Sequence, residues 1–139
     1  MQIDFHYYAT YCLARAAGLN KKSATTIATC SQFVDDSTKD ELEGHPDGGL
    51  FRTIATAHHG TDFKNLDRKD QRHIWVPFHF LPGGLGDNFT EKLVCRKDSI
   101  IAQEMMIHYF TKGYKNFQLE LIGIASHVYA DTFAHYGFS

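Results

Sequence analysis

Apolar residues recur at helical spacing over most of the chain, and short polar or glycine-containing stretches separate them. The clearest case is the segment 116–135, where Leu119, Ile122, Val128 and Phe133 recur at spacings compatible with 3.6 residues per turn. The same spacing, together with the residues that flank each segment, predicts further helices over residues 4–17, 23–33, 88–94 and 99–110.

Capping residues and glycines indicate where several of these helices begin and end. Asp4, Asn88 and Asp98 each have a side-chain oxygen that can accept a hydrogen bond from the first free N–H groups of a helix. Gly18 and Gly113 follow two of the apolar segments, and glycine is common just beyond a helix end. We therefore expect three capped helix starts and two glycine-terminated helix ends.

The middle of the chain lacks this regular pattern. Residues 37–49 are polar and rich in glycine, which predicts a loop, whereas 50–59 fits either a short strand or an extended connection. Residues 62–72 are charged and predict one or two exposed helical turns. Residues 74–81 are apolar, but Pro77 interrupts them and a Pro-Gly-Gly sequence follows, so we expect buried extended chain there. The fold class predicted is mainly α, a compact multi-helix domain with a long irregular middle segment.

Length and composition narrow the class of protein further. The 139 residues fit one domain, residues 1–139, and 43% hydrophobic against 22% charged residues excludes intrinsic disorder. The net charge of -2 gives no basic patch for nucleic acid or anionic membranes, and no apolar run is long enough for a membrane span. Three cysteines without CxxC spacing argue against a disulfide framework. The first residues lack the features of a secretory signal, so we expect a cytoplasmic protein.

Nine histidines are many for this length, and the strongest local motif contains two of them. His127, Asp131 and His135 follow one another at intervals of four, which places them on one stripe of a helix, about 6 Å apart along its axis. Two imidazoles and a carboxylate on one stripe suit a divalent cation such as zinc. The alternative is a His–Asp hydrogen bond with an unrelated histidine near the helix end, where the helix dipole favours a cation.

Other segments contribute further candidate ligands. These are His6 in the first helical turn, Asp35 or Asp36 at the end of the second helix, His58 or His59 between small residues, and His79 in an apolar stretch. An unpartnered imidazole at position 79 would be costly, although a histidine in such a stretch is often bonded to a backbone carbonyl. His45, His73 and His108 have polar or mixed neighbours, so we expect them at the surface.

The order of these residues resembles the zinc-dependent phospholipase C and P1-type nuclease group, which are all-helical metallohydrolases. The resemblance comprises an early helical histidine, an acidic residue after the second helix, a loop histidine, and the HxxxD pattern with a further histidine on the last helix. More of the chain resembles an uncharacterised bacterial family, the DUF6765-like proteins. The segments Asp4–Tyr8, Ser31–Asp36, Pro77–Phe80 and Ser126–His135 carry that resemblance.

The phospholipase-like resemblance implies a site with three zinc ions and a metal-bound hydroxide that attacks a phosphodiester. It implies that His127 and Asp131 bind metal directly, with His135 beside them, and that Asp35 or Asp36 bridges two ions. His6 and one of His58 or His59 would complete the coordination, whereas His79 has no counterpart. The chain ends four residues after His135, so we expect either the amino-terminal part of a longer protein or a site smaller than three metals.

These observations predict a divalent-metal-dependent hydrolase, using zinc, that acts on a small-molecule or lipid phosphoester. The contrasting hypothesis is a non-catalytic structural or interaction module that a metal stabilises. An HD-type phosphohydrolase is a further alternative, but the chain has no contiguous His-Asp dipeptide. A helical partner-binding module with dispersed histidines is the last alternative. The oligomeric state does not follow from the sequence.

Overall fold

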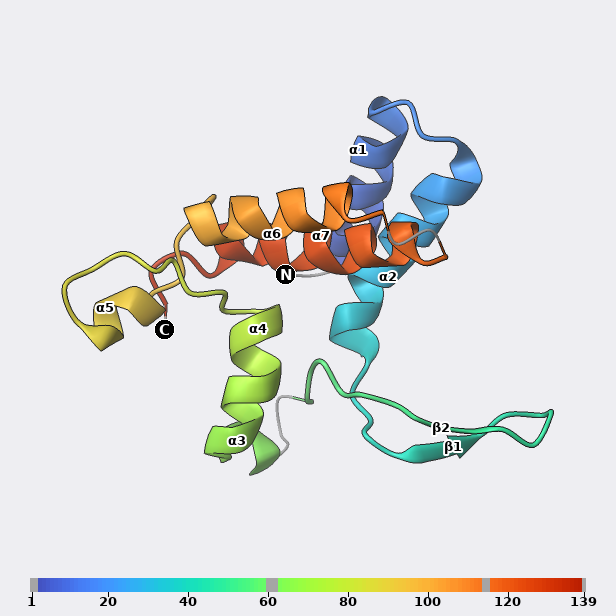
Figure 1. The fold of residues 1–139 in the computed structure, drawn as a ribbon, viewed down its shortest axis with the longest axis horizontal. Coiled ribbons are helices and arrows are strands. Elements are labelled where there is room, and N and C mark those ends of the chain that lie inside the picture. The colour runs from blue at the N-terminus through green and yellow to red at the C-terminus, as the bar shows by residue number, and fades with distance from the viewer. Residues whose placement is uncertain (1–2, 60–62, 114–115, 139) are drawn as a thin grey trace.

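The computed structural model describes residues 3–59, 63–113 and 116–138, and the chain is mainly helical (Figure 1). The longer helices lie in one body, in which α6 and α7 lie side by side, α2 packs against α7, and α1 packs against α2. A separate arm is formed by the short helices from α3 to α4, and a small hairpin extends beyond the end of α2. The elements in chain order are η1 Asp4–Ala9, α1 Thr10–Ala16, α2 Lys21–Asp36, β1 Leu42–Gly44, β2 Leu50–Arg52, η2 Phe63–Leu66, α3 Arg68–Asp70, η3 Gln71–Trp75, α4 Val76–Phe78, α5 Phe89–Leu93, α6 Ile100–Thr111 and α7 Gln118–Ala134.

The first two helices form a tight antiparallel pair. The π-helical turn η1 continues directly into α1, which confirms the predicted helix over 4–17. Gly18 then adopts a φ of 90°, a conformation that other residues rarely take, and the chain reverses. Asn20 begins α2 by accepting a hydrogen bond from the Ser23 N–H at 2.9 Å. The turn therefore fixes η1 and α1 alongside α2.

The closest packing in the molecule is between α2 and α7, and Gly123 makes it possible. A Cβ atom on Gly123 would lie 2.5 Å from the carbonyl oxygen of Ile27 and 2.7 Å from the Cβ of Cys30. Since real side chains do not approach this closely, only glycine allows the two backbones to come together here. This contact brings the second half of α7 close to the carboxyl end of α2.

The interior is polar to an unusual degree. The largest fully buried side chains are His6, His127, Thr132, Asp131, Cys95 and Ser31, and the buried hydrophobic residues are mostly small ones such as alanine. Most globular interiors are built from large aliphatic and aromatic side chains instead. The structure therefore places histidine and aspartate where a hydrophobic core would ordinarily lie.

The middle segment differs from its prediction in two respects, the first of which is strand β1, Leu42–Gly44, inside the predicted loop over 37–49. Residues 74–81 are not extended: Ile74 and Trp75 end η3, and Val76 and Phe78 lie in α4. Pro77 occurs in the first turn of α4, where a missing N–H costs no hydrogen bond, so it does not break the helix. The short-strand alternative for residues 50–59 is correct for Leu50–Arg52, which pairs antiparallel with Leu42–Gly44.

Two predicted caps are also wrong. Asp4 lies inside η1 rather than before it, and no side chain caps that helix. Ser99, not Asp98, caps α6 by accepting a hydrogen bond from the N–H of Ala102. Asp98 instead accepts a 2.6 Å hydrogen bond from the Tyr129 hydroxyl. Asn88 caps α5 as predicted. Within the described ranges, no helix is both long and apolar enough to cross a membrane.

Candidate metal centre

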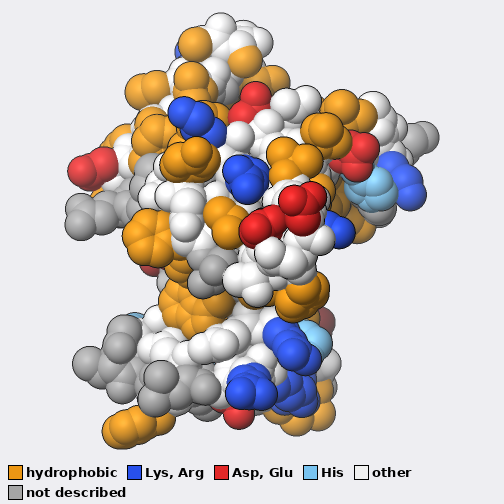
Figure 2. Space-filling view, turned by 90° about the vertical axis from the view of Figure 1, so that its left-hand side faces the viewer, with side chains coloured by type: hydrophobic (Ala, Val, Ile, Leu, Met, Phe, Trp, Pro, Cys, Tyr) orange, Lys and Arg blue, Asp and Glu red, His pale blue; other side chains and the backbone are white. Residues whose placement is uncertain are grey.

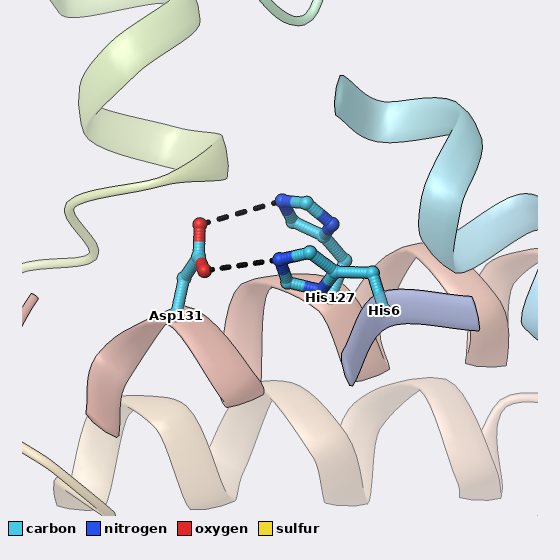
Figure 3. Close-up of side chains that lie close together, drawn as sticks. All are labelled: His6, His127 and Asp131. Atoms are coloured by element: carbon cyan, nitrogen blue, oxygen red, sulfur yellow. Dashed lines mark ion pairs between the residues drawn. The ribbon is translucent and has the colours of Figure 1, made fainter. Parts of the chain in front are cut away.

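Six side chains with metal-binding atoms converge where η1, α2, α7 and the end of α4 meet. We call this group the His–Asp cluster; its members are His6, Asp35, His79, His127, Asp131 and His135. Asp131 lies at its centre, within 3.5 Å of a ring nitrogen from each of the four histidines. Figure 3 shows His6 and His127 next to each other, both directed toward the Asp131 carboxylate.

The α7 helix supplies half of the cluster. His127 and Asp131 lie one turn apart on its buried stripe, and His135 follows at the carboxyl end of the helix. The predicted stripe with four-residue spacing is therefore present. The close packing of α7 against α2 adds Asp35, and η1 adds His6 from the opposite side.

His79 reaches the cluster because the chain around it is tied to α2. Thr56 donates from its hydroxyl to the Val34 carbonyl at 2.7 Å, and its N–H donates to the Ser37 carbonyl at 2.8 Å. The carbonyl of Thr56 in turn accepts a 2.9 Å hydrogen bond from Nε2 of His79. This bond turns Nδ1 of His79 toward Asp131, at 3.0 Å.

Three atoms of the cluster have the spacing expected for a tetrahedral zinc site. Nδ1 of His79 lies 3.0 Å from Oδ2 of Asp131 and 3.3 Å from Nε2 of His127, and that Nε2 lies 3.4 Å from the same carboxylate oxygen. Ligands about 2.0–2.1 Å from a tetrahedral zinc ion are about 3.3–3.4 Å apart. These atoms therefore form one triangular face of suitable size.

Each of the two carboxylates faces His79 and His127 with one oxygen and His6 with the other. Asp131 directs Oδ2 toward His79 and His127, and its other oxygen lies 3.3 Å from Nε2 of His6. Asp35 repeats this pattern at longer range: Oδ1 lies 3.8 Å from both His79 and His127, and Oδ2 lies 3.8 Å from His6. Both carboxylates could thus bind one ion beside His79 and His127 and a second ion beside His6.

Backbone carbonyls determine which ring nitrogens are free to bind a cation. Nδ1 of His127 donates to the Ser31 carbonyl at 2.8 Å, and Nε2 of His79 donates to the Thr56 carbonyl. A carbonyl oxygen can only accept, so in each neutral ring the nitrogen that faces Asp131 has a lone pair and no proton. Metal-binding histidines are commonly oriented by such a hydrogen bond on the other nitrogen. Two lone pairs and a carboxylate that face each other at 3.0–3.4 Å repel unless a cation lies between them.

The ring of His6 lies near both carboxylates without a well-formed hydrogen bond: its Nε2 is 3.3 Å from Asp131 and 3.8 Å from Asp35. Its side chain is fully buried, and neither ring nitrogen has a hydrogen-bond partner in the part of the chain that the structure describes. Its ring stacks on that of His127, with centroids 3.7 Å apart. Burial of an unpaired polar group costs free energy, and coordination of an ion by Nε2 would offset that cost.

Burial and neighbouring charges set the ionisation of the cluster. Burial lowers the pKa of His127 and also that of His135, which favours neutral imidazoles. Burial raises the pKa of Asp131, but the hydrogen bonds and positive charge that the neighbouring imidazoles supply when they are protonated outweigh burial and hold this pKa below its ordinary value. Neutral imidazoles around an ionised carboxylate are the protonation states that bind metal.

One edge of the cluster is open to solvent. Asp35 and His135 are 26% and 28% exposed, whereas the other four side chains are at most 4% exposed. The ring of Phe80 lies against His135, with centroids 4.5 Å apart. A small molecule that reaches the cluster would therefore approach beside Asp35, His135 and Phe80.

Three predicted ligands lie elsewhere. Asp36 is exposed and accepts a hydrogen bond from Gln32, so the choice between Asp35 and Asp36 falls on Asp35. Nε2 of His58 lies 3.2 Å from Oδ2 of Asp70, and the side chain of His59 is exposed. Among the described residues, neither histidine belongs to a group whose ligand atoms lie within 4.8 Å of one another. His45, His73 and His108 are at the surface, as predicted.

Comparison with protein families gives a match that spans the chain. A family model described as a family of unknown function, DUF6765, matches residues 1–139. The chain belongs to the DUF6765 family. Comparisons with curated proteins and with solved structures gave no significant match. The DUF6765 resemblance is thus confirmed, and these comparisons lend no support to a phospholipase C/P1 nuclease-like fold.

His79 is the member of the cluster that sequence reasoning placed least well in this DUF6765 chain. Its apolar neighbours predict either a buried ligand or a histidine bonded to a backbone carbonyl. In the structure Nε2 of His79 donates to the Thr56 carbonyl, and Nδ1 faces Asp131 as a ligand would. The loop histidine expected from the phospholipase-like order was His58 or His59. In the structure it is His79, about twenty residues further along the chain, that lies in the cluster.

Proposed function

We propose that this protein is a metal-dependent hydrolase of phosphoesters, with zinc as the metal. The observation that carries the proposal is the triangle of His79 Nδ1, His127 Nε2 and Asp131 Oδ2, in which two backbone carbonyls keep both nitrogens unprotonated. Imidazole and carboxylate ligands together suit zinc among the common divalent cations.

The arrangement of the carboxylates supports two ions rather than one. Nε2 of His127 can bind a single ion, because its other nitrogen is committed to the Ser31 carbonyl. The ring of His6 stacks on that of His127, and its Nε2 faces the carboxylate oxygens that His79 and His127 do not face. A pair of ions bridged by Asp35 and Asp131 would use all of these atoms.

Bound zinc supplies a Lewis acid and lowers the pKa of a bound water toward neutrality, which is the chemistry that phosphoester hydrolysis requires. The residues of the chain would hold and orient the substrate. The exposed edge at Asp35 and His135 leaves room for water and a phosphoryl group, and the buried histidines exclude solvent from the remaining sides.

The order of ligands along the chain supports a finer proposal. His6, Asp35, His127 and Asp131 occur in the order that resembles the phospholipase C and P1-type nuclease group, so we propose a related arrangement of helices around the metals.

One observation favours a second candidate function, a module that metal stabilises without catalysis. Four of the six cluster side chains are almost completely buried, as in closed structural zinc sites. The two candidates differ in whether a coordination position stays open for water.

Metal content and hydrolysis measured on the same preparation test the proposal. Protein purified without chelator should contain at least one zinc per chain and hydrolyse bis(p-nitrophenyl) phosphate. EDTA should abolish hydrolysis, and added zinc should restore it. The Asp131→Asn variant should lose both properties, whereas Asp36→Asn, a matched change at an exposed site, should keep them.

The two measurements together separate the outcomes. Stoichiometric zinc without hydrolysis of this or other phosphoesters would favour the structural module. Absence of bound zinc, with no change in stability on adding it, would contradict metal binding and the proposed function with it.

A further inference from the structure

A cavity of about 410 Å³ adjoins the His–Asp cluster. Among the described residues it is lined by Asn65, Gln71, Trp75, Val76 and Phe80. We call it the aromatic pocket. Its volume lies within the range of about 300–1,000 Å³ that is usual for small-molecule sites.

Both aromatic walls of the pocket contact the cluster. The Trp75 ring lies 5.1 Å from the ring of His79, and the Phe80 ring lies 4.5 Å from that of His135. His135 is one of the two cluster residues exposed to solvent. A phosphoryl group at the open edge of the cluster would therefore have the aromatic pocket beside it.

The walls suit a flat ring rather than a flexible chain. The rings of Trp75 and Phe80 contact each other edge to face, with centroids 6.4 Å apart and planes inclined by 60°, so together they form one aromatic wall on which a flat ring can pack. Aromatic rings favour offset-stacked and edge-to-face partners. The Gln71 side chain adds an amide at the rim, where it is exposed to water.

The helical arm that carries the pocket has three basic residues against two acidic ones, Asp67 and Asp70. The exposed side chains of Arg68, Lys69 and Arg72 belong to α3 and η3, the same helical arm as Gln71 and Trp75. Figure 2 shows Lys and Arg side chains gathered on the lower part of the molecule, where Figure 1 places α3. Positive charge here would attract a phosphoester toward the cluster.

A larger cavity of about 570 Å³ offers a contrast. Ser126, Ala130 and Phe133 line it on another face of α7. Phe5, which also lines this cavity, contacts the ring of His6, and His6 is fully buried. That cavity therefore does not lead to the exposed edge of the cluster, and an apolar chain in it would not place a phosphoryl group beside His135.

We infer that the aromatic pocket binds a planar aromatic ring of the phosphoester, so that Trp75 and Phe80 determine which substrates are accepted. The inference rests on the proposed function, because it assumes that the phosphoryl group binds at the cluster. A nucleobase and a simple aryl group share this planar chemistry, and the test below has an arm for each.

Trp75 is the single tryptophan of the chain, so its fluorescence reports on the pocket directly. The zinc-loaded protein would be titrated with phenyl phosphate and with cyclohexyl phosphate, which match in size but differ in planarity. Phenyl phosphate should change the fluorescence and bind about three- to ten-fold more tightly, the gain expected from an aromatic pair. Adenosine 5′-monophosphate against ribose 5-phosphate tests the nucleobase in the same way.

The Phe80→Leu variant should lose this preference while it retains its zinc. Phe89→Leu is the control, because Phe89 is an exposed aromatic residue of α5 and does not line the pocket. The inference about the aromatic pocket would be wrong if planar and non-planar phosphates bound equally. It would also be wrong if neither bound to a protein that hydrolyses bis(p-nitrophenyl) phosphate. Either result would leave the proposed function intact. A protein without zinc and without hydrolysis would overturn both.

Discussion

The hydrogen bonds of single histidine rings decide what the cluster can do. His127 donates to the carbonyl of Ser31 and His79 donates to that of Thr56, so the remaining nitrogen of each neutral ring presents a lone pair to Asp131. These bonds are long-range, because the two members of each pair are 96 and 23 positions apart in the chain. A sequence motif identifies candidate ligands, but it does not show which nitrogen is available.

The choice between neighbouring acidic residues can be tested at this scale. Asp35→Asn should weaken zinc binding at least about ten-fold, because it removes a charged ligand that faces three histidines. Asp36→Asn should leave the affinity unchanged, since that side chain is exposed and contacts Gln32. Competition with a chromophoric zinc chelator measures both affinities. Equal weakening in the two variants would contradict the assignment of Asp35.

The sequence predicted the ligands that lie on one helix better than those that depend on tertiary structure. The stripe of His127, Asp131 and His135 follows from helical periodicity alone. His79 required knowledge of how residues 53–59 attach to α2, which no local pattern contains. His58 was a plausible ligand by composition, but in the fold its ring contacts Asp70.

At the scale of elements, most helices were predictable and some of their ends were not. The apolar periodicity located α2, α6 and α7 to within a few residues. The sequence predicts extended chain at residues 74–78 because a proline in an apolar stretch usually ends a helix, whereas Pro77 lies in the first turn of α4, a position that tolerates it. Asp98 was a reasonable cap, yet Ser99 takes that role and frees Asp98 to bond Tyr129.

Helix spacing controls the cluster through Gly123. In Gly123→Ala the added methyl group would collide with the Ile27 carbonyl and Cys30, which should move α7 away from α2 and displace the Ser31 carbonyl from His127. We expect a loss of about 1–3 kcal/mol in the free energy of unfolding, measured with urea. Zinc affinity should fall about ten-fold as the orienting hydrogen bond lengthens.

Gly44→Ala serves as the control for this variant. Its added Cβ would meet only Leu50 Cδ2, at an ordinary 4.0 Å, so stability should change by less than about 0.5 kcal/mol. If Gly123→Ala unfolded at the same urea concentration as the unaltered protein, the close approach of α2 and α7 would not be required for the fold.

At the scale of the whole molecule, a polar cluster is buried and many large apolar side chains are exposed. Leu13, Phe33, Phe110 and Phe133 are all at least half exposed, while histidine and aspartate occupy the centre. An interior of this kind costs free energy unless the buried groups satisfy one another or share an ion. The mainly helical class and a buried polar site could be predicted from sequence, but the full membership of the site could not, because the choice of His79 over His58 or His59 depends on tertiary packing.

Anomalous diffraction at the zinc absorption edge, from a crystal of the protein purified without chelator, tests the central claim most directly. The account predicts a strong peak about 2.0–2.2 Å from His79 Nδ1, His127 Nε2 and an oxygen of Asp131, with a second peak beside His6 if two ions bind. A map with no peak at the cluster after soaking in zinc, or with zinc bound only at surface histidines, would contradict it.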